Sequence, residues 1–242
     1  MFGWPFFMTP GSSFSAAHEA PLLFATLLLL VVAVVLAQLA EGGIDVKALA
    51  LLGVLTAIGA VLRPLGAGLA GLETVFFLLV VAGRVLGPGF GFVLGSTTLF
   101  ASALLTGGVG PWLPFQMFAA AWVGLGAGLL PPARGRAEVV LLAGYGALSA
   151  FLYGFAINLS AWPFVLGGDT ALSFDPAASA WTNLHRYVLY DLATSLGWDA
   201  GRALTNAVLI AVTGRVLLAT LRRAVRKAAF HAPVRFGPDQ VR

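Results

Sequence analysis

The residues of this sequence that could contact a ligand fall at the ends of long apolar segments. Arg63 and Glu73 flank the stretch RPLGAGLAGLE, and Trp112 and Gln116 follow a Gly-Pro turn that begins another apolar segment. Guanidinium, carboxylate and amide groups set among aromatic rings are typical of a small-molecule pocket. The predicted ligand contacts are Arg63, Glu73, Trp112, Gln116, Asn158 and Trp162.

These polar residues also have structural explanations. Arg63 is explained equally well by a ligand contact and by a structural ion pair, and Trp112 could be an aromatic anchor at the membrane interface. In the stretch WDAGRALTN, the residues Asp199, Arg202 and Asn206 share one helical face. An ion pair between Asp199 and Arg202 would lower the cost of placing charge near lipid, so this pair is predicted to be structural.

Several kinds of catalytic and cofactor chemistry lack their sequence signals. There is no GxxxxGK[ST] loop for nucleotide phosphates and no HExxH motif, and cysteine is absent. The histidines His18, His185 and His231 are scattered along the chain. The run Gly95–Thr98 lacks the partners of a nucleophilic serine. We therefore expect no catalytic residue, no metal site and no cofactor.

The composition indicates a membrane protein. The chain is 59% hydrophobic and 10% charged, against about 25% charged in an average soluble domain. After Lys47, the only charged residues up to Pro131 are Arg63, Glu73 and Arg84. A segment so poor in charge must lie in lipid. The sequence therefore predicts an all-α polytopic membrane protein in contact with the lipid bilayer.

Polar or Gly- and Pro-rich breaks divide the apolar sequence into seven expected membrane spans. They are 21–40, 48–62, 72–86, 90–105, 114–130, 139–161 and about 198–221. The more polar stretch 163–197 is expected to form a loop that carries an amphipathic or re-entrant helix. The first span could instead be a cleaved signal peptide, but it lacks the leading basic residues and the shorter apolar core of such a peptide, which favours an uncleaved span.

The distribution of basic residues predicts the orientation of the chain. Half of the Lys and Arg residues lie from Arg215 onward. Placing this end in the cytoplasm puts every basic residue inside except Arg63, Arg186 and Arg202, in keeping with the positive-inside tendency. The N-terminus then lies outside, and the polar groups that need a special reason all lie on the outer side. The basic C-terminal end is better explained as a membrane-proximal anchor than as a nucleic-acid-binding patch, so no nucleic acid is expected as a partner.

The predicted span 48–62 carries small residues at steps of three and four. Ala50, Gly53, Ala57 and Ala60 therefore form one smooth stripe along which another helix can approach closely. Packing within the chain's own bundle and docking to a partner subunit explain this small-residue stripe equally well.

Two stretches of the sequence carry a resemblance to a known family. They are Lys47–Pro131, which begins KALALLGVLTAIGAVLRPLGAGLAGLE, and Gly197–Leu209, which reads GWDAGRALTNAVL. With 139–161, they resemble the substrate-specificity (S) component of energy-coupling factor (ECF) transporters, the vitamin-importing branch of ABC transporters. The resemblance is greatest to the S components of high-GC actinobacteria.

This resemblance implies a division of the chain and a set of partners. It implies a six-helix substrate-binding domain at 47–222, an extra transmembrane helix with its lead-in at 1–46, and a basic cytoplasmic tail at 223–242. A vitamin would bind near the outer face under the loops 63–71, 106–114 and 162–198. The small-residue stripe would contact the transmembrane coupling subunit, and two separate ATPase subunits would supply the energy. The extra first span departs from the family pattern, so family contacts are not extended to residues 1–46.

The sequence therefore predicts a non-enzymatic, multi-pass protein of the cell membrane that captures a vitamin or vitamin precursor for an ECF-type importer. Similarity to related systems suggests a cobalamin-type compound. A stand-alone secondary transporter or channel is the alternative, although mid-membrane carboxylates for a proton relay are not evident in the sequence. A membrane enzyme acting on lipid-linked substrates is a third hypothesis, and it should show His, Asp or Glu clustered on one membrane face.

Reporters fused to the two ends of the chain test the predicted topology. We expect the N-terminal reporter outside the membrane and the C-terminal reporter in the cytoplasm, because this orientation leaves most basic residues inside. A cytoplasmic N-terminus would contradict the assignment.

Overall fold

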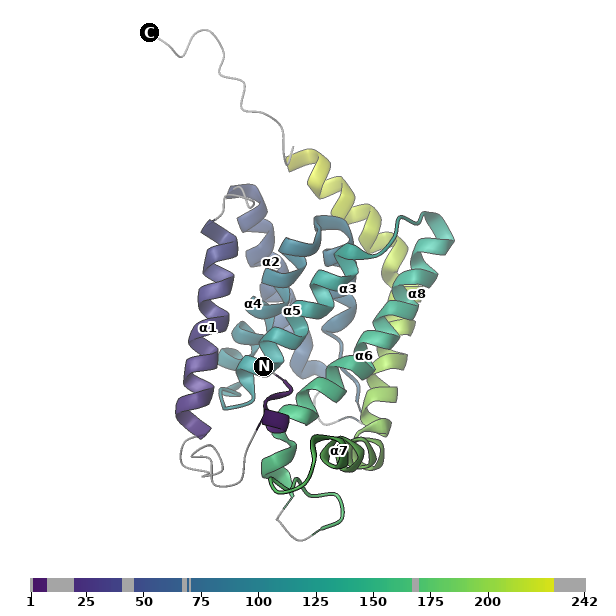
Figure 1. Cartoon of the computed structure of the whole chain (residues 1–242). Coiled ribbons are helices and arrows are strands. Elements are labelled where there is room, and N and C mark those ends of the chain that lie inside the picture. Colours follow the sequence, from purple (N-terminus) through teal and green to yellow (C-terminus); the bar gives the residue numbers. More distant parts are fainter. Residues whose placement is uncertain are drawn as a thin grey trace, which may run out of the picture.

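The computed structural model describes residues 2–7, 20–40, 46–66, 69, 71–166 and 170–228. Every regular element in these ranges is a helix, which confirms the all-α fold (Figure 1). The predicted basic tail beyond residue 228 and the residues His18 and His231 lie outside the described ranges. The elements are η1 (Trp4–Phe7), α1 (Ala20–Ala40), α2 (Val46–Leu62), η3 (Arg63–Gly66), α3 (Phe76–Leu86), α4 (Pro88–Thr106), α5 (Leu113–Leu129), α6 (Gly135–Val165), α7 (Ala180–Thr194) and α8 (Leu196–Ala228).

The length and apolar surface of the helices make this a polytopic membrane protein. Among the described residues, the segments Lys47–Gly66, Pro88–Thr106, Gly135–Val165 and Leu196–Lys227 are long and apolar enough to cross a bilayer. Shorter apolar segments occur at Leu28–Ala37, Phe76–Leu86 and Leu113–Leu129. Large apolar side chains on the outside of the bundle, such as Leu104, Val140 and Val212, are exposed. Lipid is the solvent that such a surface requires.

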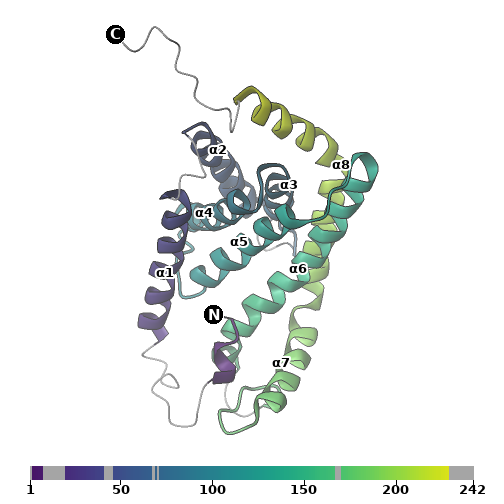
Figure 2. The same ribbon diagram turned by 45° about the horizontal axis from the view of Figure 1, so that its top comes forward.

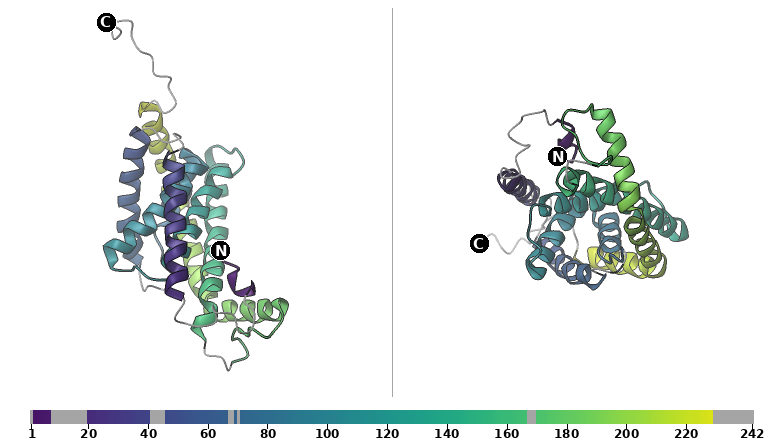
Figure 3. Two further views of the ribbon diagram at one scale, coloured as in Figure 1. Left: turned by 60° about the vertical axis from the view of Figure 1, so that its left-hand side comes forward. Right: turned by 90° about the horizontal axis from the view of Figure 1, so that it is seen from below.

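The helices pack as a bundle with α3, α4 and α5 at its centre. Helix α1 packs on α4 and α5, whereas α6 and α8 lie side by side on the other flank, as Figure 2 shows. Helix α7 lies across the end of the bundle, as both views of Figure 3 show. The predicted helix within the stretch 163–197 is present at Ala180–Thr194, and Asn183, Tyr187 and Tyr190 are its buried residues.

Several helix boundaries differ from the sequence-based expectation; for example, α6 begins at Gly135 rather than at residue 139, and α8 ends at Ala228 rather than near residue 221. Helix α3 begins at Phe76 rather than at residue 72, because Thr74 donates a hydrogen bond from Oγ1 to the Leu62 carbonyl at 2.6 Å and so keeps the preceding loop out of the helix. Helix α6 continues through Pro163 to Val165, beyond the expected end at residue 161. Pro163 has no N–H to donate to the Leu159 carbonyl, so one helical hydrogen bond is lost, and the helix ends two residues later at Val165.

Glycines hold the central helices in close contact. A methyl group added to Gly124 of α5 would lie 2.2 Å from the Gly91 carbonyl oxygen of α4, and one added to Gly83 of α3 would lie 2.1 Å from the Gly124 carbonyl oxygen. Such distances leave no room for any side chain. The sequence-based interpretation treated the glycines of this region as turn-formers or as part of the small-residue stripe. It was wrong for these three, whose role is to let three backbones meet.

The two ends of the bundle both carry buried charge. Glu138, at the start of α6, is 1% exposed and accepts hydrogen bonds from Arg84 Nε at 2.9 Å and Arg222 Nη2 at 2.7 Å. Arg84 also donates to the Leu130 carbonyl at 2.8 Å. This end is opposite to the one that carries α7. We expected all the polar residues that call for a special explanation to lie on the outer side of the membrane. This expectation was wrong, because α3, α6 and α8 bury Glu138 at the opposite end.

Substitution of Gly124 by alanine tests the close packing of the central helices. We expect Gly124→Ala to destabilise the protein by about 2 kcal/mol or more, because the added methyl group would overlap the α4 backbone. Thermal unfolding of the purified protein in detergent measures the effect. Gly144→Ala is the matched control, since a methyl group at this exposed α6 glycine meets nothing within 4 Å. Equal stability of the two variants would contradict the packing interpretation.

Candidate functional site

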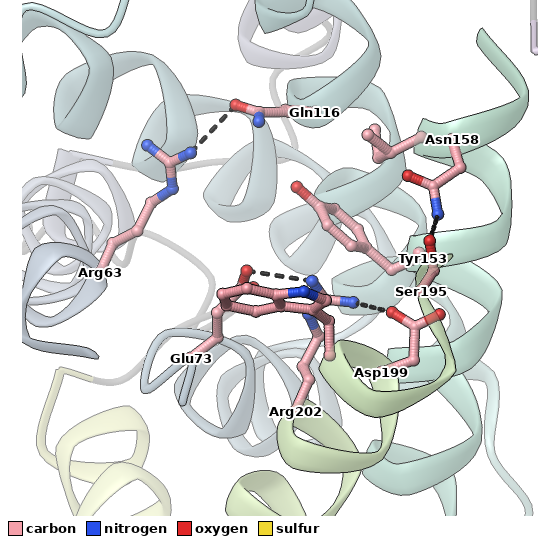
Figure 4. Close-up of a pocket in the computed structure, with 11 residues that line it drawn as sticks. Arg63, Glu73, Gln116, Tyr153, Asn158, Ser195, Asp199 and Arg202 are labelled. Atoms are coloured by element: carbon pink, nitrogen blue, oxygen red, sulfur yellow. Dashed lines mark hydrogen bonds and ion pairs between the residues drawn. The ribbon is translucent and has the colours of Figure 1, made fainter. Parts of the chain in front are cut away.

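A cavity of about 200 Å³ opens at the end of the bundle near α7 (Figure 4). Its walls come from η3, the loop before α3, and helices α5, α6 and α8, so segments far apart in the sequence converge on it. The lining residues are Arg63, Glu73, Gln116, Tyr153, Gly154, Ile157, Asn158, Ser195, Trp198, Asp199 and Arg202.

The structure brings together most of the predicted ligand contacts. Arg63, Glu73, Gln116 and Asn158 all line the cavity. Figure 4 shows Arg63 and Gln116 facing each other on one side and Glu73, Arg202 and Asp199 grouped on another, with Tyr153 near the centre of the view. Four of the six predicted ligand contacts therefore line one cavity with polar walls, and their role in binding a ligand stays a prediction.

Trp112 and Trp162 do not line this cavity. Trp112 is 51% exposed, and its indole N–H donates to the Gly108 carbonyl at 3.3 Å. Trp162 is fully buried beside Phe174 and Tyr187, and its indole N–H donates to the Leu172 carbonyl at 2.8 Å. Trp162 therefore anchors the loop after α6 to the bundle, a structural role that the sequence pattern alone did not separate from ligand contact.

Arg202 is the centre of the charged network in the cavity wall. Its guanidinium donates to Glu73 through Nε and Nη2 at 2.9 and 3.1 Å, and through Nη1 to Asp199 at 2.5 Å. It also lies over the rings of Phe76 and Tyr153, 5.9 and 5.1 Å from their centroids. The predicted pair of Asp199 and Arg202 is confirmed, and Glu73 joins it from a distant loop. The two carboxylates and the two aromatic faces together stabilise this buried cation.

Arg63 is held differently from Arg202. Its Nη2 donates to Gln116 Oε1 at 3.0 Å. Within the described ranges no carboxylate lies within salt-bridge distance of its guanidinium. The contact that the structure gives to Arg63 is therefore a neutral hydrogen bond. The structural ion pair is thus not present within the described ranges, and the ligand contact of Arg63 stays a prediction.

Asn158 connects the cavity to α7. Its amide nitrogen donates to Asp191 Oδ1 at 2.8 Å and to Ser195 Oγ at 2.5 Å. Close by, the Tyr187 hydroxyl donates to the Phe155 carbonyl. Burial raises the pKa of the Tyr187 phenol, so this group stays a protonated donor. These polar contacts to α6 hold α7 next to the cavity.

Some lining residues were not among the predicted ligand contacts. Tyr153 and Ile157 lie one helical turn apart on α6, immediately before Asn158, so the helical period places them on the same wall. Gly154 must be small, because a methyl group there would lie 2.0 Å from Asp199 Oδ1. Asn206, which shares a face with Asp199 and Arg202, is fully buried and does not line the cavity. Its amide has no hydrogen-bond partner among the described residues.

The small-residue stripe of α2 is partly buried in the chain's own bundle and partly exposed. Ala60 is 5% exposed and packs inside the bundle. Ala50, Gly53 and Ala57 are exposed, and a methyl group added to Gly53 would meet nothing within 4 Å. The larger part of the stripe therefore forms an open, shallow face on the outside of α2.

Comparison with known proteins finds no matching family model, no matching curated protein and no matching solved structure.

Substitution of Arg202 tests whether it organises the cavity wall. We expect Arg202→Ala to destabilise the protein by about 3–5 kcal/mol, because Glu73 and Asp199 would keep their charges without a partner. Arg202→Lys keeps the charge but loses the two-pronged contact to Glu73, so its effect should be smaller. Thermal unfolding measures both variants, and Arg136→Ala, at an exposed position on the opposite end, is the control. An unchanged unfolding temperature in Arg202→Ala would show that the network is dispensable.

Proposed function

We propose that this chain is the membrane-embedded substrate-binding (S) subunit of an ECF-type importer. It captures a small vitamin-like molecule at the outer face, and separate coupling and ATPase subunits drive its transport. The observation that carries the proposal is the cavity itself, in which Arg63, Glu73, Gln116 and Asn158 converge from four segments at one end of a membrane bundle.

The chemistry of the cavity suits binding. Two of its acidic groups, Glu73 and Asp199, are engaged by Arg202, and the Asn158 amide is engaged by Asp191 and Ser195. Such mutually satisfied groups form a preorganised wall that orients a ligand. Tyr153 and Trp198 add aromatic surface against which an apolar part of the ligand can pack.

The open face of α2 supports the second part of the proposal. Ala50, Gly53 and Ala57 leave a shallow surface on which a helix of another subunit can approach closely. This face lies on a different helix from the walls of the cavity. Docking of a coupling subunit there would leave the ligand contacts untouched, so binding and transport should respond to different substitutions.

The size of the cavity narrows the expected substrate. Small-molecule sites commonly have volumes of about 300–1,000 Å³, and this cavity has about 200 Å³. A cobalamin-type compound, with its large corrin ring, far exceeds this space. The cavity favours a compact vitamin or vitamin precursor over the cobalamin-type substrate suggested by similarity.

Separate assays of binding and uptake test the proposed function. We expect the purified chain to bind one small ligand without ATP, identified by mass spectrometry of the copurifying molecule. Uptake of that molecule by cells should require the coupling subunit and both ATPases. Gly53→Leu and Ala57→Leu should abolish uptake and spare binding, because they obstruct only the face of α2.

Gly144→Leu on α6 is the matched control, since it adds the same bulk at another exposed glycine. Uptake should survive this substitution. Transport by the chain alone in vesicles would instead establish a stand-alone carrier. Loss of binding in both α2 variants would show that the stripe is not a docking face.

A further inference from the structure

We propose that the ligand of this cavity is a small dipolar organic acid. Its carboxylate lies against Arg63, and an N–H donor at its other end faces Glu73. This inference rests on the proposed binding function, and it adds the chemical class of the substrate.

The Arg63 side of the cavity calls for an anion. A guanidinium keeps its charge at every physiological pH and carries five N–H donors. The structure gives Arg63 one hydrogen bond, to the neutral amide of Gln116. The remaining donors have no carboxylate to accept them within the described part of the chain. A carboxylate matches the planar fork of a guanidinium, and a charge-assisted contact of this kind is stronger than a neutral one.

The opposite wall has the reverse polarity. Glu73 and Asp199 share the single guanidinium of Arg202, so this group of three carries a formal charge of −1. The Asp199 side chain is 5% exposed, whereas that of Glu73 is 33% exposed. Each carboxylate oxygen accepts more than one hydrogen bond, so Glu73 keeps acceptor capacity while it is bound to Arg202. Glu73 is thus the acidic group available to a donor on the ligand.

The summed charge of the walls selects against ligands with two negative charges. Arg63 and Arg202 balance Glu73 and Asp199, so the lining is formally neutral. A dipolar acid places its one anion at the uncompensated cation and its donor at the acidic wall. A phosphate monoester would bring a second negative charge into a poorly solvated site that has no second free cation among the lining residues.

The space between the two walls limits the body of the ligand. Since a water molecule takes up about 30 Å³ in the liquid, a volume of about 200 Å³ corresponds to about seven water molecules. Covalently bonded atoms lie closer together than separate water molecules, so a small molecule with somewhat more non-hydrogen atoms than this fits. The aromatic rings of Tyr153 and Trp198 line this space, so a flat body fits it best.

Three related probes test each end of the proposed ligand. They are 4-aminobenzoate, which has the carboxylate and the donor; 4-aminobenzamide, in which a neutral amide replaces the carboxylate; and benzoate, which lacks the amine. Isothermal titration of the purified full-length protein in lipid nanodiscs measures their affinities. We expect 4-aminobenzoate to bind about tenfold to a hundredfold more tightly than 4-aminobenzamide, the range expected for one charge-assisted contact. Benzoate should bind more weakly than 4-aminobenzoate.

Variants of Arg63 connect this preference to one side chain. Arg63→Gln should remove the preference for the acid over the amide, and Arg63→Lys should keep part of it, because the charge remains without the planar fork. Arg136→Gln, at an exposed position on the opposite end of the bundle, should bind the probes as the wild type does. Thermal unfolding of each variant shows whether it is folded.

The outcomes separate this inference from the proposed function. Equal affinity for the acid and the amide, a preference that survives Arg63→Gln, or no binding of any probe would overturn the ligand class. If a neutral molecule nevertheless copurifies and binds without ATP, the binding function stands without this ligand class. If no small molecule binds the wild type at all, both proposals are wrong.

Discussion

The buried guanidinium of Arg202 is the constraint on which the ligand-binding end of this bundle depends. Its side chain is 9% exposed within a membrane helix, and a cation in such a place must be neutralised by the protein itself. Asp199 lies one turn away on the same helix and supplies one negative charge. The second comes from Glu73, so the loop between α2 and α3 has to reach α8. Gly154 completes the arrangement by leaving space for the Asp199 carboxylate.

At the opposite end of the bundle the buried charge is negative, and cations neutralise it. There a buried acid, Glu138, is held between Arg84 of α3 and Arg222 of α8. Helices α3, α6 and α8 also meet at the Arg202 end through Phe76, Tyr153 and Arg202 itself. Contacts of charged side chains therefore connect these three helices at both ends of the bundle. Between the two ends, Gly83, Gly91 and Gly124 bring α3, α4 and α5 into close contact. A framework held in this way keeps the cavity walls in place without a ligand.

The features that the sequence predicted well are those set by local periodicity and solvent. The apolar segments and the amphipathic helix α7 follow from hydrophobicity and a helical period, and both are present. The pair of Asp199 and Arg202 was predictable because an i,i+3 spacing determines the contact within one helix. The sequence also indicated four of the residues that line the cavity, because polar groups at the ends of apolar segments are typical of a small-molecule pocket. These residues are Arg63, Glu73, Gln116 and Asn158.

The features that the sequence did not reveal depend on contacts between distant segments. Glu73 and Arg202 are 129 residues apart, and nothing in either stretch identifies the other. Glu138 resembles an ordinary first-turn acid until α3 and α8 bury it. The sequence does not show whether the Trp162 indole stacks on a ligand or packs within the protein. In the structure it is buried and anchors the loop after α6. Gly124 was interpreted as a turn-former, yet it lies where the backbones of three helices meet.

Two properties follow from the amino-acid sequence alone: the chain lies in lipid, and certain polar groups stand at the ends of its apolar segments. These properties follow from the free energy of placing each residue in hydrocarbon or water, which is a property of the residue and its near neighbours. Only the tertiary structure decided which polar groups meet. It put Glu73 on Arg202 and Gln116 on Arg63, because buried charges must find partners among whatever surfaces the packing of helices brings together.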